Sequence, residues 1–286
     1  MKITEIIKGG APSLSFEVFP PKTTDKFEGV LNATMKIAAL SPSYMSVTYG
    51  AGGGTSEHTA NIASSLLAGG VTPLAHLSCI SSTRAEVKER LVDLKARGIE
   101  NVLALRGDIP EGMNVADMEY KYASELIGEI KEFGGFCIGG ACYPEGHPES
   151  PSARADIEAL RIKAMAGCDF FTTQMFFDND IMYNFMYRLL AAGVNVPVIP
   201  GIMPVTNAAQ IKRIIAISGN CLPQKFLRIV DRYGDNSEAM MQAGIAFATE
   251  QIIDLYANGF NAVHVYSMNK PVVAEKIKAN LSSIIG

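Results

Sequence analysis

Short apolar segments alternate with longer helical patterns along almost the whole chain. We predict strands at residues 14–19, 44–48, 72–78, 101–105, 136–142, 169–175, 197–201 and 262–266. The first seven begin about 30 residues apart, which is the length that one strand–helix–strand step needs. Nearly unbroken apolar strands joined through helices are typical of a parallel sheet covered by helices. Eight strands in this order favour a closed (β/α)8 TIM barrel over an open doubly wound sheet.

Between the strands, the helical patterns have recognisable ends. We predict helices over residues 24–38, 83–96, 152–166, 207–217, 237–257 and 271–283. Thr83 followed three positions later by Glu86 forms a capping box, which marks a helix start. The long gap before the last strand contains residues 220–236, which we interpret as an inserted loop or short helix near the site. We expect one domain over residues 1–286.

Composition excludes several classes of protein. The chain is 48% hydrophobic and 19% charged, as in soluble globular proteins. A net charge of −4 gives no basic stripe for nucleic acid. No apolar run is long enough to span a membrane, and residues 1–8 are too charged for a signal peptide. The five cysteines form no C-x-x-C pair and are interpreted as buried free thiols, so we expect a cytoplasmic protein.

Polar side chains recur inside the predicted strands or directly after them. The carboxyl ends of the strands of a parallel barrel share one rim, so these side chains should build a single polar site. The candidates from this pattern are Glu17, Thr48, Tyr49, His76, Arg106, Gly107, Asp108, Tyr143, His147 and Gln174.

Glu17 is the most informative single residue. Its neighbours Phe16, Val18 and Phe19 are apolar, and burial favours the protonated form of a carboxyl group. A protonated carboxyl near neutral pH suits a general acid, whereas an ion-paired structural acid is the alternative. Asp108 either lies in a solvated turn or places its charge against a cationic ligand or transition state.

Two other features are weaker signals. Residues 50–54 read G-A-G-G-G, but Thr55 occupies the last glycine position of a dinucleotide fingerprint, and no G-K-[ST] triplet exists. This loop is either a flexible turn or a backbone surface that approaches a ligand. The four histidines show no H-x-x-H or H-x-x-x-H spacing, so we predict no metal site.

Six motifs together resemble the methylenetetrahydrofolate reductase family. Residues 15–21 read S-F-E-V-F-P-P, which is similar to the family signature S-F-E-[FV]-F-P-P. The others, in order, are V-T-Y-G-A at 47–51, H-L-S-C at 76–79, A-L-R-G-D at 104–108, Y-P-E-G-H-P at 143–148 and P-G-I-M-P at 200–204. The resemblance covers about residues 14–270 and implies a flavin-bearing barrel that reduces 5,10-methylenetetrahydrofolate to 5-methyltetrahydrofolate.

The resemblance also implies roles for individual residues. Glu17 aligns with the general acid that protonates N10 of the folate, and Asp108 with the carboxylate that stabilises the resulting cation. Gln174 aligns with an amide that contacts the pterin, and Tyr266 and Lys270 are further substrate contacts. The residues that carry over as FAD contacts are Thr48, Tyr49, His76, Leu105, Arg106, Gly107, Asp108, Ala123, Tyr143, His147, Asp156 and Lys163.

The chain departs from the family pattern at three positions. Ile162 replaces a basic residue, and Ala159 stands where a polar contact is common, so FAD is expected to be held less tightly or by other groups. Lys270 replaces the usual arginine, which keeps the charge but loses the bidentate fork.

Partners follow from the same resemblance. We expect a ping-pong reaction with NADH or NADPH as donor, a homo-oligomer, and room for an accessory electron-transfer subunit. Two alternatives stay open. One is a folate-binding barrel without redox chemistry, such as a pterin-dependent methyltransferase, and the other is a subunit of a larger electron-transfer complex.

Overall fold

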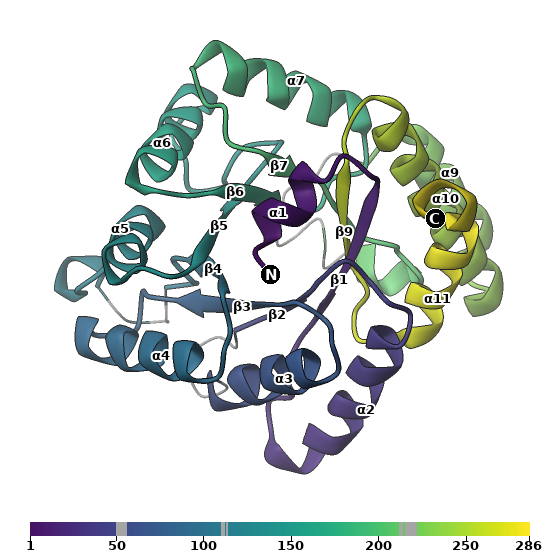
Figure 1. Cartoon of the computed structure of the whole chain (residues 1–286). Helices are drawn as coiled ribbons and strands as arrows, with labels where there is room; N and C mark the ends of the chain where they lie inside the picture. The colour runs from purple at the N-terminus through teal and green to yellow at the C-terminus, as the bar shows by residue number, and fades with distance from the viewer. Residues whose placement is uncertain (50–55, 110–111, 113, 212–213, 215–221) are drawn as a thin grey trace.

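The computed structural model of the protein describes residues 1–49, 56–109, 112, 114–211, 214 and 222–286. In these ranges nine parallel strands form one sheet, in the order β7-β6-β5-β4-β3-β2-β1-β9-β8. The strands are β1 (Ser13–Val18), β2 (Met45–Val47), β3 (Pro73–Ser78), β4 (Asn101–Leu105), β5 (Cys137–Cys142), β6 (Phe170–Thr173), β7 (Val198–Ile199), β8 (Gly201–Ile202) and β9 (Ala262–Tyr266). Figure 1 shows them curled around a common axis, with the helices outside.

One proline divides the strand that we predicted at residues 197–201. Pro200 separates β7, which pairs with β6, from β8, which pairs with β9. Proline has no backbone N–H and cannot continue a ladder on the donor side. Its carbonyl still accepts a hydrogen bond from the backbone N–H of His264 at 2.9 Å. The predicted TIM-type barrel is therefore confirmed, with its seventh strand in two short pieces.

The helices surround this sheet, and those that precede β9 in the chain connect its strands. They are α2 (Phe27–Ala38), α3 (Ser56–Ala68), α4 (Arg84–Ala96), α5 (Ala123–Phe133), α6 (Ala153–Ala166), α7 (Asn179–Ala191), α9 (Gln224–Tyr233), α10 (Ser237–Ala257), α11 (Pro271–Asn280) and α12 (Ser282–Ile285). The capping box predicted at Thr83 is present, with Glu86 reaching back to the Thr83 N–H at 2.7 Å. Ser152 caps α6, and Gly167 ends it in the left-handed region.

The predicted helix at 24–38 begins as a 3-10 turn (Thr24–Lys26) before α2, and the one at 271–283 divides into α11 and α12. The predicted insertion contains α9. Of the helix predicted at 207–217, residues 207–211 and 214 are described, and all of these except Asn207 are helical. The glycine-rich loop at 50–54 lies outside the described residues.

A helix that we did not predict from the sequence closes the end of the barrel at which the strands begin. The short helix α1 (Ile3–Lys8) lies across the barrel axis in Figure 1. Ile3 is fully buried, and its backbone N–H donates to Asn101 Oδ1 at 2.9 Å. It packs on an apolar layer made of Tyr44, Leu74, Leu103, Cys137, Phe170, Ile199 and Ala262. Apolar side chains therefore fill most of the interior at the end of the barrel where the strands begin.

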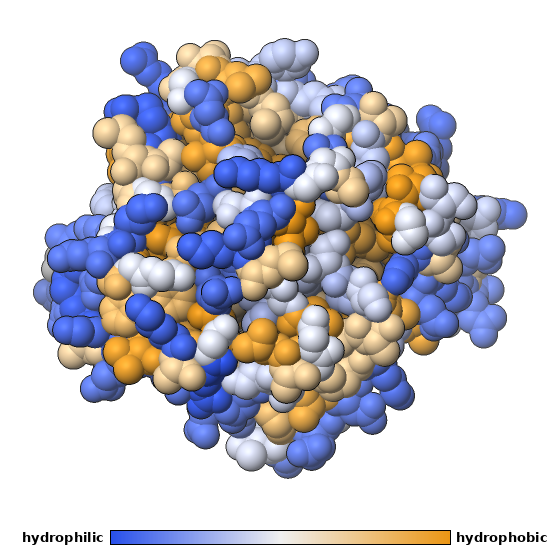
Figure 2. All heavy atoms as spheres, viewed as in Figure 1, coloured by the Kyte–Doolittle hydropathy of each residue, from blue (hydrophilic) through white to orange (hydrophobic). Residues whose placement is uncertain are grey.

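A larger hydrophobic core lies between the sheet and the helices, and includes Phe16, Val47, Leu77 and Val265 from the outward faces of the strands. Figure 2 shows hydrophilic residues over much of the surface that surrounds α1, with hydrophobic residues in separate groups.

Cys79, Cys137, Cys142 and Cys168 are buried free thiols as predicted, whereas Cys221 lies outside the described residues. Within the described ranges, no helix combines the length and apolar character that crossing a membrane requires.

Candidate active site

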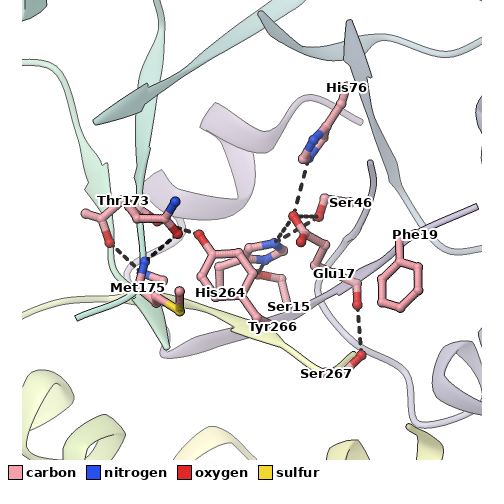
Figure 3. A network of polar contacts seen from close by, with 12 residues as sticks. Ser15, Glu17, Phe19, Ser46, His76, Thr173, Met175, His264, Tyr266 and Ser267 are labelled. Atoms are coloured by element: carbon pink, nitrogen blue, oxygen red, sulfur yellow. Dashed lines mark hydrogen bonds and ion pairs between the residues drawn. The ribbon is translucent and has the colours of Figure 1, made fainter. Parts of the chain in front are cut away.

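Glu17 lies inside the upper end of the barrel, on β1. Its side chain is one-fifth exposed and is surrounded by groups from three other strands (Figure 3). Ser46 Oγ on β2 lies 3.4 Å from Glu17 Oε2, His76 Nε2 on β3 lies 3.6 Å away, and His264 Nε2 on β9 lies 4.0 Å away. The strand register explains the arrangement, because β1 pairs with β2 on one side and with β9 on the other.

Burial controls the charge state of this cluster. Desolvation raises the pKa of Glu17 to about 8, and the Ser46 hydroxyl opposes that rise. Burial also lowers the pKa of His76 and of His264 to about 3. Near neutral pH the acid is therefore mostly protonated and both imidazoles are neutral. The short contacts of Glu17 with the histidines are consequently not ion pairs at that pH.

The two histidines have different surroundings. His264 stacks on Tyr44, with ring centroids 5.5 Å apart, and both of its nitrogens lie close to serine hydroxyls. His76 Nε2 is buried without a hydrogen-bond partner among the described residues. An unpaired buried nitrogen is costly, so it is a candidate for a bond to a bound ligand.

Tyr266 on β9 lies beside Glu17, on the side of β1 that faces away from β2. Its hydroxyl donates to the carbonyl oxygen of Thr173 at 2.5 Å, which links β9 to β6 across the barrel. Gly201 makes this approach possible, because a Cβ there would lie 2.5 Å from the Tyr266 hydroxyl. The Gly201 N–H donates to Thr173 Oγ1 at 2.8 Å.

The chain that follows Glu17 is fixed by residues after β9. Ser267 Oγ donates to the Glu17 carbonyl oxygen at 2.8 Å. The Asn269 side chain accepts from the Phe19 N–H at 2.9 Å and donates to the Phe19 carbonyl at 2.8 Å. These contacts fix the backbone that carries the Glu17 side chain.

Arg106, Gly107 and Asp108 follow β4 at the same rim. Gly107 has φ +89, and a Cβ there would lie 2.0 Å from Ser78 Oγ, so only glycine fits. Asp108 is exposed. Arg106 forms a bidentate ion pair with Glu149, at 2.6 and 2.7 Å. Leu105, the last residue of β4, is partly buried beside them.

Tyr143, His147, Asp156 and Lys163 lie together after β5 and on α6. The Tyr143 and His147 rings meet edge to face, with centroids 4.6 Å apart. Burial raises the pKa of Asp156, and the His147 backbone N–H opposes that rise. Lys163 Nζ donates to the Ala141 carbonyl at 2.8 Å, and burial lowers its pKa. Ile162, by contrast, is nearly half exposed.

The remaining predicted residues lie around the same end of the barrel. Thr48 and Tyr49 follow β2, and the Arg90 guanidinium lies 5.4 Å from the centroid of the Tyr49 ring. Ala123 is the first residue of α5. Gln174 follows β6, and its Oε1 accepts from the Met175 N–H at 3.0 Å.

Lys270 lies after β9, at the start of α11, and Nζ donates to Thr206 Oγ1 at 2.9 Å. Within the described ranges, no cluster of three or more histidine, cysteine or acidic side chains has the arrangement of a metal site.

Sequence reasoning missed two members of the cluster around Glu17. Ser46 and His264 were not singled out, although each is a polar residue between apolar neighbours in a strand. Ser15 and Glu17 are two positions apart, as are His264 and Tyr266, so each pair faces the barrel interior. Period-two polar pairs in otherwise apolar strands were the available signal.

Comparisons with known proteins agree with one another. The family model described as methylenetetrahydrofolate reductase matches residues 2–282. The 5,10-methylenetetrahydrofolate reductase of Escherichia coli (strain K12) is 35% identical over 262 residues, which are 91% of this chain and 88% of that protein. The methylenetetrahydrofolate reductase (NADH) 1 of Arabidopsis thaliana is 33% identical over 298 residues, covering 99% of this chain and 50% of that protein.

A solved structure adds evidence on the fold alone. An uncharacterised protein from Clostridium thermocellum, described as binding two copies of 5-methyl-5,6,7,8-tetrahydrofolic acid, superposes with a TM-score of 0.67 at 14% identity. The match covers 100% of this chain and 99% of that one.

Proposed function

Because the chain belongs to the methylenetetrahydrofolate reductase family, we propose that it reduces 5,10-methylenetetrahydrofolate to 5-methyltetrahydrofolate. The observation that carries this proposal is the state of Glu17. A carboxyl group whose pKa is raised to about 8 can donate a proton near neutral pH, as opening the folate's five-membered ring requires.

The rim residues fit a flavin, and we propose FAD as the cofactor. Gly107 leaves room for close backbone approach after β4, and the unpartnered His76 Nε2 offers a polar contact inside the barrel. Arg106 and Lys163 supply positive charge on the same side. The residues proposed to hold it are Thr48, Tyr49, His76, Leu105, Arg106, Gly107, Asp108, Ala123, Tyr143, His147, Asp156 and Lys163.

Glu17 acts first in the proposed reaction. Its proton moves to N10 of the folate, the bond between N10 and the methylene carbon breaks, and an iminium cation forms at N5. Asp108 stabilises that cation, because an exposed aspartate at the rim can place its charge against it. A reduced flavin bound at this rim would supply the hydride that converts the methylene group into a methyl group.

Other residues bind and orient the folate. We propose that Gln174 turns its amide from the Met175 N–H toward the pterin, and that Tyr266 forms part of the pocket wall. Lys270 would meet the glutamate carboxylate of the folate as a single point charge. The proposed electron donor is NADH or NADPH, which would use the site in turn with the folate in a ping-pong sequence.

The test separates the folate step from the donor. The purified protein is supplied with FAD, photoreduced without oxygen and mixed with 5,10-methylenetetrahydrofolate while the visible flavin band is followed. Return of the oxidised band together with 5-methyltetrahydrofolate would support the proposal without any assumption about the donor. A colourless protein that binds folate but no flavin would favour a non-redox folate-binding barrel instead.

Glu17→Gln provides the matched variant for that assay. It should keep flavin and be reduced by the donor at the wild-type rate, but lose folate reduction, because only the second half-reaction uses the acid. Normal folate turnover in this variant would remove Glu17 from the mechanism. Reduction by a purified electron-transfer protein but not by NADH or NADPH would indicate an accessory subunit.

A further inference from the structure

A continuous chain of hydrogen-bonding groups leads from Glu17 to the backbone of β9 (Figure 3). The Ser46 hydroxyl lies 3.4 Å from Glu17 Oε2 and 2.9 Å from His264 Nε2. On the other side of the imidazole, Ser15 Oγ lies 2.7 Å from Nδ1 and 3.1 Å from the Val263 carbonyl oxygen. Each hydroxyl and the neutral imidazole has a single proton, so the donors in this chain must be assigned together.

With Glu17 protonated, all four contacts can be hydrogen bonds. Glu17 donates to Ser46, Ser46 donates to His264 Nε2, Nδ1–H donates to Ser15, and Ser15 donates to the carbonyl of Val263. A carbonyl can only accept, so the last bond fixes the direction of the others. In this assignment the Ser46 proton points away from Glu17.

With Glu17 ionised, only three of the four bonds can exist. Ser46 must donate to the carboxylate, because a carboxylate has no proton to give. Either His264 Nε2 then loses its donor, or the imidazole adopts its other tautomer and the contact between Ser15 and Val263 has no hydrogen. Ionisation therefore costs one hydrogen bond in either tautomer.

We propose that His264 is a positioning residue that holds Glu17 in its protonated form, because it accepts the Ser46 proton and so withholds it from the carboxylate. Ser15 acts one step further away, by fixing the tautomer of His264. After Glu17 has given its proton to the substrate, the Ser46 hydroxyl turns to the carboxylate and no other proton moves. This inference deepens the proposed function, since it concerns the acid on which that function rests.

Other titratable groups face Glu17 in the described part of the chain. They are His76 on β3, Tyr44 before β2 and Tyr266 on β9. Burial lowers the pKa of His76 and raises the pKa of both tyrosines, so all three are neutral near pH 7. Within the described ranges, the basic side chains that lie within 4.0 Å of Glu17 are histidines only. Because none of these neighbouring groups changes its charge near pH 7, the hydrogen-bond chain can shift the pKa of Glu17 there.

The test is a titration that needs no turnover. Protein labelled with ¹³C at the glutamate side-chain carboxyl carbon is followed by NMR between pH 5 and 10, and Glu17→Gln assigns the resonance. His264→Phe keeps a ring against Tyr44 but removes the acceptor for Ser46. We expect the midpoint of Glu17 to fall by about half to one pH unit, the equivalent of one hydrogen bond. Ser15→Ala should lower it in the same direction.

The double variant Ser46→Ala/His264→Phe distinguishes this chain from a general change in packing. Compared with Ser46→Ala alone, it should titrate at the same pH, because no hydroxyl is left to turn to the carboxylate. An unchanged or higher Glu17 midpoint in His264→Phe would overturn the proposal. So would a double variant whose midpoint lies as far below that of Ser46→Ala as the His264→Phe midpoint lies below that of the wild type. If His264→Phe does not fold, Ser15→Ala with and without Ser46→Ala gives the same comparison. A protein that fails to reduce folate can still be titrated, so the two proposals fail separately.

Discussion

Replacing Glu17 with glutamine should stabilise the folded protein, and the gain should grow with pH. The ordinary pKa of this carboxyl is 4.5, and burial raises it to about 8 in the folded chain. Between these values the unfolded chain has lost the proton while the folded chain keeps it. At this group the folded state thus binds more protons, and the contribution of Glu17 to the free energy of unfolding falls as pH rises through this window. Glutamine does not titrate, so this fall in the free energy of unfolding with pH is absent from the variant.

The size of the gain follows from the two pKa values. Each pH unit inside the window lowers the contribution of Glu17 to the free energy of unfolding by about 1.4 kcal/mol. The variant should therefore be more stable by about 1 kcal/mol at pH 5 and about 3 kcal/mol at pH 7, with no further increase well above pH 8. The lowered pKa values of His76 and His264 make stability rise with pH between about 3 and 6.5, but this effect occurs in both proteins and cancels in the difference.

Urea unfolding at pH 5 and pH 7 measures this difference. With a slope of about 3 kcal/mol per molar urea, the midpoint at pH 7 should move up by about 1 M. A gain of the same size at both pH values would refute the reasoning, because it would mean that the folded acid is already ionised at pH 5. Glu158→Gln on α6 is the control.

The Arg161 guanidinium lowers the pKa of Glu158, which is exposed. Its contribution to stability is therefore present above pH 4.5 and is lost as pH falls below that value. Removing it can only destabilise at neutral pH, which is the opposite sign to the effect of Glu17→Gln.

Three further substitutions test other parts of the site. Gly107→Ala should lower stability by roughly 2 kcal/mol or more in urea unfolding, because φ is +89 and the new Cβ would meet a serine hydroxyl. An unchanged midpoint would contradict this. Tyr266→Phe should cost about 1–2 kcal/mol of stability, since it removes the bond to the Thr173 carbonyl, and calorimetry should show a lower Tm. Glu149→Gln frees Arg106 from its bidentate ion pair, so FAD affinity measured by fluorescence quenching should rise at low salt. A fall in affinity would show that Arg106 needs Glu149 for its orientation.

Much of the fold could be predicted because each strand–helix step carries its own local signals. Thr83, Ser152 and Ser237 mark helix starts within one residue of their positions in the structure. The break at Pro200 was not predicted, although a residue without an N–H was the available signal. The plug formed by α1 was not predictable in this way, because a six-residue helix is stable only through its tertiary packing.

In the candidate site, too, some features could be predicted from the local sequence and others could not. The raised pKa of Glu17 could be expected because its apolar neighbours mark a buried strand, and burial of that strand in the fold desolvates the carboxyl group. Its hydrogen-bond chain could not, because Ser15 and His264 are 249 residues apart and meet only through the pairing of β1 with β9. The ion pair between Arg106 and Glu149 depends in the same way on two loops whose positions the barrel fixes.

The pairing of β9 also has a consequence for how the protein is made. β9 is hydrogen-bonded to β1 on one side and to β8 on the other, so the barrel cannot close until residues near 266 have left the ribosome. Until then Glu17 lacks the wall formed by His264 and Tyr266, and the nascent chain carries it hydrated and ionised. Such long-range pairing is slow, because the intervening chain must be ordered before the contact forms. At neutral pH the final closure should therefore take up a proton from the medium, in the same event that dehydrates the acid.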